Sequence, residues 1–283
     1  MRHMVLLSAG LIGALTLASC SREIDKEAVE RALQDVNVID ESNLNSVILN
    51  SSDPNEAVSY FQRALAHNPD RIDMQRGLAS SLVRAKRYTE ASAAWQKVTA
   101  MPGATQEDKV DLADALIRTN AWNKAKDVLA TVPPTHETFK RYRLEAMVAD
   151  SRQDWKAADS FYETAVGLTT TPGGVFNNWG FSKLTRGDYA EAERLFGEAL
   201  RQDPNLFTAK NNLVLARGAQ RNYSLPVISM TQIERAQLLH TMALSAVKQG
   251  DVSTGEGLLR DAIATHPQHF DAAARALEAL ENG

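Results

Sequence analysis

A small residue recurs along the chain at nearly constant spacing, and this period limits the fold more than any other feature. Five alanines follow one another at intervals of 34, 34, 33 and 34 residues; they are Ala57, Ala91, Ala125, Ala158 and Ala192. A large residue stands four positions after each alanine; these are Phe61, Trp95, Leu129, Tyr162 and Phe196. A period of roughly 20 to 50 residues is typical of proteins built by stacking one supersecondary unit on the next. The sequence therefore predicts an array of similar units.

Each unit has the pattern of two helices joined by a turn. An aromatic residue stands three positions before four of the alanines, at Tyr88, Trp122, Trp155 and Tyr189. Thirteen positions before the alanine a first helix carries its own pair of residues, as in Leu78-Ala79 and Trp179-Gly180. Small residues let two helices approach closely, and large ones fill the space between units. The four tryptophans, Trp95, Trp122, Trp155 and Trp179, all fall at core positions, so we expect none of them to stack on a ligand.

This pattern resembles the tetratricopeptide repeat over residues 53–268. Prolines follow several of the units, and proline cannot continue a helix; they are Pro69, Pro102, Pro134 and Pro204. The resemblance implies an all-α fold, a right-handed superhelical solenoid of about six to seven helix pairs. The alanine-rich segment from His269 to Leu280 has the position of a C-terminal capping helix.

The sixth unit breaks the pattern. The position 34 residues after Ala192 is Pro226, which lacks the N–H that a helix needs, so we expect residues 222–231 to be irregular and extended. A helix resumes where Thr231 and Glu234 have the spacing of a capping box. Two interpretations of the irregular strip stay open: a degenerate repeat with a packed loop, or a partner site that also sets the register.

The first 20 residues have the order of an export signal. Arg2 precedes an apolar run from Val5 to Leu17, which is shorter than the roughly 20 residues of a membrane span. The sequence Leu17-Ala18-Ser19-Cys20 resembles the lipobox of bacterial lipoproteins, which implies cleavage before Cys20 and its lipidation. The alternative is an ordinary signal peptide or anchor helix with an incidental cysteine.

The resemblance sets the expected organisation of the chain. Residues 1–19 are a signal peptide, residues 20–30 a lipidated tether, and residues 31–283 the solenoid, with one atypical helix over 31–50. Ser21 is non-acidic, which in such lipoproteins implies the outer membrane, with the chain on its periplasmic face.

Composition and motifs argue against several function classes. The chain has 31 basic and 35 acidic residues and a net charge of −4, which does not suit a nucleic-acid groove. One cysteine and six scattered histidines offer no zinc spacing, and no glycine-rich loop cradles a phosphate. We therefore expect no enzyme, no metal, no cofactor and no small-molecule substrate.

In tetratricopeptide arrays the first helices line a concave groove, and this resemblance places the candidate site. The groove of units two to four carries charges of both signs, whereas units five to seven present apolar side chains and amides, which suit a helix or an extended peptide. The candidate partner-binding residues are Asn177, Phe181, Leu184, Asn211, Leu215, His240 and Leu244. Asn178 and Asn212 fall where such repeats carry a structural asparagine. The irregular strip could instead cover Phe181 and Leu215.

Three short strings carry a resemblance to a narrower family. They are Lys210 to Arg217, then Tyr223 with Leu225-Pro226-Val227, then Ala243 to Asp251. Together with the lipobox they resemble the TadD-type lipoproteins of tight-adherence (Flp) pilus systems. That family implies a pilotin-like factor whose partner is the secretin or another pilus assembly component. The alternative is a periplasmic scaffold for peptidoglycan enzymes or for outer-membrane protein assembly.

Overall fold

The structure is a computed structural model that describes residue 45, residues 48–50 and residues 53–282. The chain divides into two units, residues 1–52 and residues 53–283, and the helices below belong to the second. The predicted signal peptide, Cys20 and the tether lie outside the described residues. Of the predicted atypical helix over 31–50, residues 45 and 48–50 are described, and they are helical.

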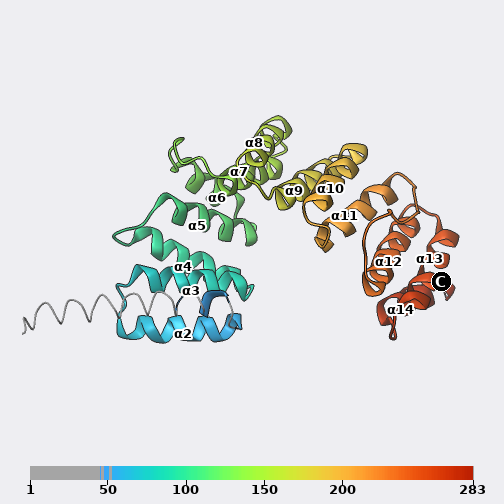
Figure 1. Ribbon diagram of the computed structural model, residues 1–283, viewed down its shortest axis with the longest axis horizontal. Coiled ribbons are helices and arrows are strands. Elements are labelled where there is room, and N and C mark those ends of the chain that lie inside the picture. Colours follow the sequence, from blue (N-terminus) through green and yellow to red (C-terminus); the bar gives the residue numbers. More distant parts are fainter. Residues whose placement is uncertain (1–44, 46–47, 51–52, 283) are drawn as a thin grey trace, which may run out of the picture. The chain divides into compact units, whose positions relative to one another are not determined.

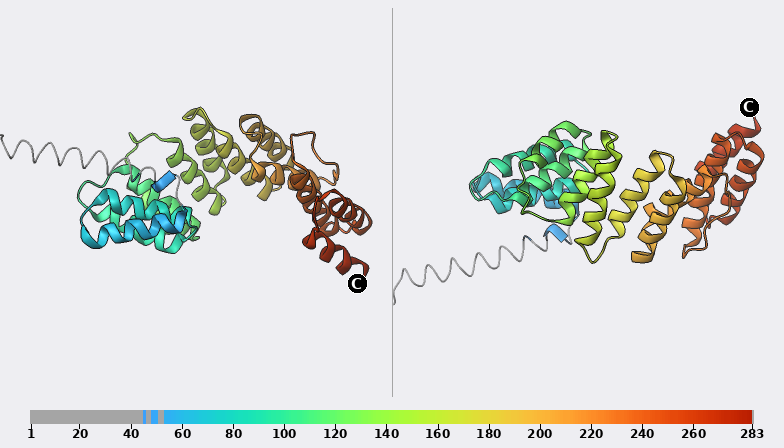
Figure 2. Two further views of the ribbon diagram at one scale, coloured as in Figure 1. Left: turned by 60° about the horizontal axis from the view of Figure 1, so that its bottom comes forward. Right: turned by 90° about the horizontal axis from the view of Figure 1, so that it is seen from above.

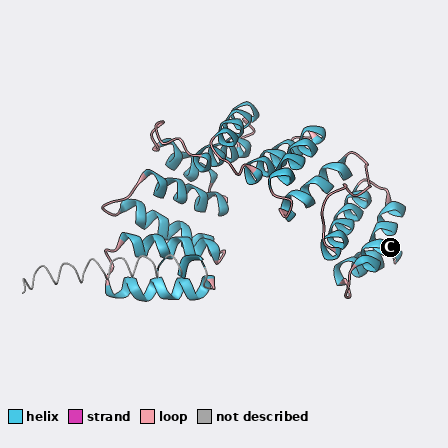
Figure 3. Cartoon of the chain, in the orientation of Figure 1, coloured by secondary structure: helices cyan, strands magenta, loops and turns pink. Residues whose placement is uncertain are grey.

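Helices make up all the regular secondary structure of the described residues (Figure 3). Their bounds are α2 (Pro54–His67), α3 (Ile72–Arg84), α4 (Tyr88–Ala100), α5 (Gln106–Arg118), α6 (Trp122–Ala130), α7 (Phe139–Ser151), α8 (Trp155–Gly167), α9 (Gly173–Thr185), α10 (Tyr189–Gln202), α11 (Phe207–Ala219), α12 (Gln232–Lys248), α13 (Val252–Thr265) and α14 (Asp271–Glu281).

Each helix packs mainly against its neighbours in the chain, so that the helices follow one another in consecutive pairs (Figures 1 and 2). Five pairs are complete: α3 with α4, α5 with α6, α7 with α8, α9 with α10, and α12 with α13. Helix α2 is the second helix of the first unit, and α14 packs on α13 as the predicted capping helix. The predicted all-α array of helix pairs is confirmed.

The periodic alanines lie where two helices of a pair meet. All five are completely buried, and the large residue that follows each of them is at most 4% exposed. Gly180 shows how close the helices come, because a Cβ atom at this position would lie 2.7 Å from the Phe196 ring of α10. A small residue is therefore required by contact, as the period predicts.

The same alanines also begin each second helix. The N–H of Ala91 donates to the carbonyl of Arg87, and Ala158 and Ala192 make the same bond to Asp154 and Asp188. This bond is the first of the helical ladder, which joins an N–H to the carbonyl four residues earlier.

The sixth unit starts like the others and departs at one residue. Arg221 adopts the left-handed conformation that also ends the first helices at Lys86, Asn120 and Gln153, and the Asn222 N–H returns to the carbonyl of Arg217. Tyr223 then takes the place of the aromatic turn residue. Pro226 stands at the alanine position and has no N–H to make the first helical bond, so no second helix forms over residues 222–230.

The irregular strip is nevertheless packed. Pro226 is buried, and Leu225 and Tyr223 pack against the cluster of Val214, Leu238 and Met242. Ile228 packs against the separate cluster between α10 and α11. Val227 is the large hydrophobic residue of the strip that is fully exposed to solvent. The geometry agrees with the packed-loop interpretation, and α12 begins with the predicted Thr231–Glu234 capping box.

At two helix N-termini the capping carboxylate also binds a cationic side chain of the preceding first helix. At α12 the capping carboxylate of Glu234 accepts from the Thr231 N–H at 2.7 Å and from the buried Lys210 ammonium at 3.0 Å. At α5 the capping carboxylate of Asp108 accepts two hydrogen bonds from Arg76 of α3, each 2.7 Å long. Each carboxylate thus caps its own helix and binds the neighbouring unit.

Candidate protein-binding groove

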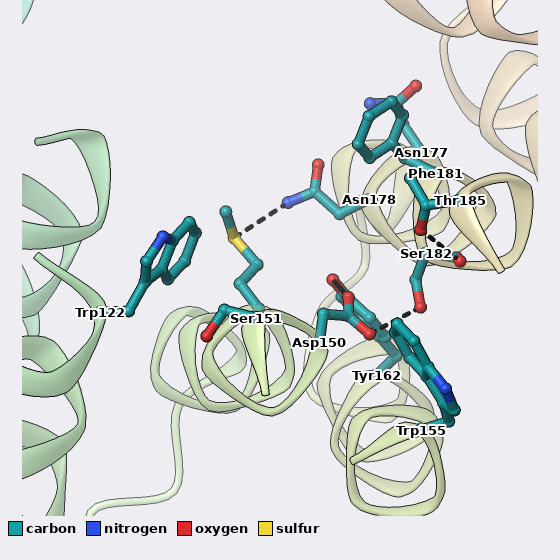
Figure 4. A pocket seen from close by; sticks show the side chains of 11 residues that line it. Trp122, Asp150, Ser151, Trp155, Tyr162, Asn177, Asn178, Phe181, Ser182 and Thr185 are labelled. Atoms are coloured by element: carbon teal, nitrogen blue, oxygen red, sulfur yellow. Dashed lines mark hydrogen bonds between the residues drawn. The ribbon is translucent and has the colours of Figure 1, made fainter. Parts of the chain in front are cut away.

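A cavity of about 300 Å³ is bounded by side chains from the α6–α9 region (Figure 4). Its lining consists of Trp122, Met147, Asp150, Ser151, Trp155, Tyr162, Asn177, Asn178, Phe181, Ser182 and Thr185. It contains two of the candidate residues, Asn177 and Phe181. Phe181 is 49% exposed, so its ring is free to contact a partner.

The carboxylate of Asp150 lies in the wall of this cavity between two helices. One oxygen accepts a hydrogen bond of 2.8 Å from the Tyr162 hydroxyl of α8, and the other accepts one of 2.7 Å from the Ser182 hydroxyl of α9. Burial raises the pKa of the Asp150 carboxyl above its ordinary value, and these hydrogen bonds offset the effect only in part. The site therefore holds a fixed, poorly solvated carboxylate.

Two tryptophans also line the cavity. Trp122 and Trp155 occupy the same place in successive units, as the first residues of α6 and α8, and both are half-buried. The prediction that the tryptophans lie in the core is confirmed for Trp95, and Trp122 and Trp179 pack against core clusters. The prediction did not include the cavity that Trp122 and Trp155 line. The residue that starts a second helix lies at the edge of the unit, so one part of its ring packs inward while another faces the cavity.

A second cavity, of about 560 Å³, gathers three more candidate residues. Leu184 of α9, Leu215 of α11 and Leu244 of α12 line it, together with Tyr189 of α10 and Lys248. Leu244 is 46% exposed, and Leu184 and Leu215 are half-buried. Three successive first helices thus present one leucine each to the same hollow. No residue of the irregular strip lines it, and Phe181 is also open, which argues against the alternative that the strip covers Phe181 and Leu215.

The candidate asparagines are engaged between neighbouring first helices. The Asn212 amide donates to the Asn177 side-chain oxygen at 3.1 Å, and the Thr241 hydroxyl donates to the Asn211 side-chain oxygen at 2.8 Å. Asn178 donates to the Met147 sulfur at 3.5 Å. Asn178 and Asn212 therefore have the structural positions expected of them, and Asn177 and Asn211 share in the same contacts.

His240 lies outside both cavities. Its ring packs against Phe270, which precedes α14, with the ring centroids 5.4 Å apart. Burial there lowers the pKa of His240. Phe270, next to the capping helix, thus lies against a position that repeat spacing alone assigns to the groove. His240 and Asn211 are the candidate residues that line neither cavity.

The charged half of the face is largely paired within itself. Arg118 binds Asp114 at 3.2 Å and lies over the Tyr88 ring, and Lys140 binds Asp111. In the carboxyl-terminal half, by contrast, Phe181 and Leu244 are 49% and 46% exposed. Sequence reasoning missed Ser182 and Tyr189 as lining residues. The only signal for Ser182 was its spacing, 32 residues after Asp150, which is close to one repeat.

Among the described residues, no helix has the length and hydropathy of a membrane span. Among the same residues, no group of three or more His, Cys, Asp or Glu side chains is arranged to hold a metal ion.

The comparisons with known proteins agree with the geometry. Residues 49–101 match the family model for the tetratricopeptide repeat. No curated protein matches the chain. A solved structure of the APC/C hetero-tetramer Cut9–Hcn1 has a TM-score of 0.60 at 13% identity. The match covers 83% of this chain and 48% of that one, so this chain spans about half the length of the matched chain.

In two further solved structures the match covers almost the whole of the other chain. A tetratricopeptide repeat protein from Parabacteroides merdae ATCC 43184 has a TM-score of 0.58 at 12% identity, over 85% of this chain and 97% of that one. PilW, described as a widely conserved type IV pilus biogenesis factor, has a TM-score of 0.52 at 15% identity, over 73% and 98%. At this low sequence identity, the similarity shows a shared fold only. Residues 49–101 are thus a tetratricopeptide repeat by sequence, and the helices from α2 to α14 form a superhelix of the tetratricopeptide type.

Proposed function

We propose that this chain is a membrane-tethered adaptor of the bacterial envelope that binds a protein partner and catalyses no reaction. Tetratricopeptide repeats bind proteins and are typically non-catalytic, and one segment of this chain is such a repeat. The observation that carries the proposal is the row of Leu184, Leu215 and Leu244 around the cavity of about 560 Å³. An amphipathic helix or an extended peptide buries its apolar side chains in such a hollow.

The size of this surface indicates a modest intrinsic affinity. Complete burial of a leucine side chain is worth about 1.5–3 kcal/mol, and these three leucines are already partly buried. Ordering a bound peptide also costs free energy, so the leucine row alone supports weak binding. A second interaction or a high local concentration is needed for a stable complex.

The proposed lipid anchor supplies that concentration. Acyl chains on Cys20 would hold the chain at the outer membrane on its periplasmic face, since several chains make release negligible. When both partners are confined to one membrane, the local concentration replaces intrinsic affinity. The lipobox-like sequence before Cys20 supports this part of the proposal.

For the partner we propose the secretin or another assembly component of a tight-adherence (Flp) pilus, with this chain as a pilotin-like assembly factor. The support comes from the strings that resemble TadD-type lipoproteins, and from the likeness in fold to the pilus biogenesis factor PilW. The second candidate remains a periplasmic scaffold for peptidoglycan enzymes or outer-membrane protein assembly.

A site-specific cross-linking experiment in cells tests the function. A photoreactive amino acid replaces Leu215 in the groove, and a matched variant carries it at Leu168, which is 40% exposed after α8 and lines neither cavity. Irradiation of the Leu215 variant is expected to capture secretin or pilus proteins, identified by mass spectrometry. The Leu168 variant should capture them much less.

The same experiment separates the alternatives. Capture of murein hydrolases or barrel-assembly proteins from Leu215 favours the second candidate, and equal capture from both positions contradicts the groove. A Cys20→Ser version of the Leu215 variant tests the tether: its yield is expected to fall because the local concentration is lost. An unchanged yield would show that the anchor has no part in binding.

A further inference from the structure

The carboxylates of Asp150 and Asp159 lie in one part of the array but differ in what they bind. Asp159 of α8 pairs with both Lys183 and Arg186 and also accepts a hydrogen bond of 2.7 Å from the Trp179 indole. Asp150 binds two hydroxyl groups and forms no ion pair with another described residue, although Arg186 also influences its charge. The carboxylate of Asp150 at the wall of the cavity thus has no direct ion pair, and Arg186, which pairs with Asp159, acts on it only from a longer range.

The two hydroxyl donors fix this carboxylate in place. Ser182 is 2% exposed and Tyr162 is 1% exposed, so both donors are held in place by the packing of α9 and α8. An ionised carboxylate can accept about four hydrogen bonds, and these donors use two. Acceptor capacity remains for a donor that enters from the cavity.

The walls around Asp150 are rich in aromatic rings, which attract cations. Arg186 already lies over the Trp155 ring, 5.5 Å from its centroid, so the chain itself places a guanidinium against this indole. The Phe181 ring is half exposed at the same cavity (Figure 4). Such faces stabilise a positive charge by about 0.5–2 kcal/mol, depending on how far it is desolvated.

We infer that this cavity binds the cationic side chain of an arginine or lysine of the protein partner. The inference rests on the proposed function, since it names a feature of the partner. The guanidinium or ammonium group donates to the free acceptor positions of Asp150, and its alkyl stem lies against Phe181. A volume of about 300 Å³ is at the lower end of ligand pockets and suits one side chain.

Other occupants fit less well. An acidic side chain would meet the charge of Asp150, and an apolar side chain would remove water from a carboxylate without giving it a new partner, which is costly. Helix α9 lines both cavities, with Phe181 at this one and Leu184 in the leucine row. The partner segment therefore combines a basic residue with neighbouring apolar ones.

The test uses the full chain as purified from cells, with fluorotryptophan incorporated and the signals of Trp122 and Trp155 followed by NMR. The probe is Nα-acetyl-arginine amide, and the control ligand is Nα-acetyl-citrulline amide, which has nearly the same shape without the charge. We expect the arginine probe to shift the Trp155 signal with a dissociation constant on the order of 1 mM. The citrulline probe should bind at least about tenfold more weakly.

Two matched pairs of variants locate the site. Asp150→Asn is expected to weaken arginine binding about tenfold or more, whereas Glu163→Gln, an equal charge change at an exposed position on α8, should leave it unchanged. Phe181→Ala should weaken it, whereas Phe139→Ala, at another exposed phenylalanine, should not. Circular dichroism of each variant shows whether the fold is retained.

Acid gives an independent readout. The charged groups facing Asp150 and its hydroxyl partners are Arg186 and Asp159, with Arg143 near Tyr162. Because the pKa of Asp150 is raised, mild acid protonates it while the arginine probe stays charged, so binding is expected to weaken as the pH falls. The Asp150→Asn variant should lack this dependence.

Equal binding of both probes, or full arginine binding by a folded Asp150→Asn variant, would contradict the inference, as would the absence of any shift. These outcomes are distinguishable from a failure of the proposed function. If Leu215 captures a partner while arginine does not bind, the proposed function is supported and the cation site is contradicted. If arginine binds at Asp150 while Leu215 captures nothing, the cavity is a cation site and the proposed adaptor function is contradicted.

Discussion

Single residues decide whether each helix pair can form. The periodic alanine leaves room for the partner helix, and its N–H makes the first hydrogen bond of the second helix. Pro226 fails in the second of these roles, which is why one proline removes a whole helix from the sixth unit. Gly180 shows the first role in its strictest form, because even a methyl group would meet the Phe196 ring.

Two glycine substitutions are expected to have opposite effects. Gly180→Ala should lower the free energy of unfolding by about 1–3 kcal/mol, because the new Cβ atom would lie 2.7 Å from the Phe196 ring. Gly197→Ala, inside α10 with no atom within 4 Å of the added Cβ, should raise it by about 0.5–1 kcal/mol. Urea unfolding of the two variants measures both changes. A stability gain in Gly180→Ala would show that α9 and α10 are not packed so closely.

The spacing of residue types correctly predicted the burial of most of these single residues, and the exceptions have clear causes. The alanines and the large residues at one repeat period are buried as expected. The exposure of Trp122 and Trp155 at a cavity depends on how successive units are placed, which the period of a single unit does not contain. The contact of His240 with Phe270 likewise depends on where the capping helix docks.

At the scale of elements, the irregular strip replaces a helix and keeps part of its packing role. Tyr223 and Leu225 fill space against α11 and α12, and Ile228 fills space against α10 and α11. Sequence reasoning predicted where the helix fails and where the next one begins. It left the role of the strip open, because an extended segment without periodicity does not indicate which side chains turn inward.

Neighbouring residues of the strip are expected to differ sharply. Ile228→Ala should cost about 1–2 kcal/mol of stability, since it removes partly buried methylene and methyl groups from the packing between α10 and α11. Val227→Ala should change stability by less than about 0.5 kcal/mol, because the side chain is fully exposed. Thermal unfolding followed by circular dichroism compares the two. Equal losses would mean that the strip is not packed as described.

At the scale of the whole molecule, the described helices form a chain of nearest-neighbour contacts rather than one shared core. Each pair packs against the next, as in other repeat arrays, and the first helices lie together on one face. The sequence predicted this architecture from its period. It predicted the site only in outline. Leu184, Leu215 and Leu244 do share a cavity, and Asn177 and Phe181 share another, while Asn211 and His240 line neither.

The central claim is that a protein partner binds on the face of the first helices in the carboxyl-terminal half. Hydrogen–deuterium exchange of the full chain, with and without the partner captured at Leu215, tests it most directly. The account predicts slower exchange in α9, α11 and α12 on binding, with little change in α8, α10 and α13. Protection confined to those second helices, or to residues 222–231, would contradict it.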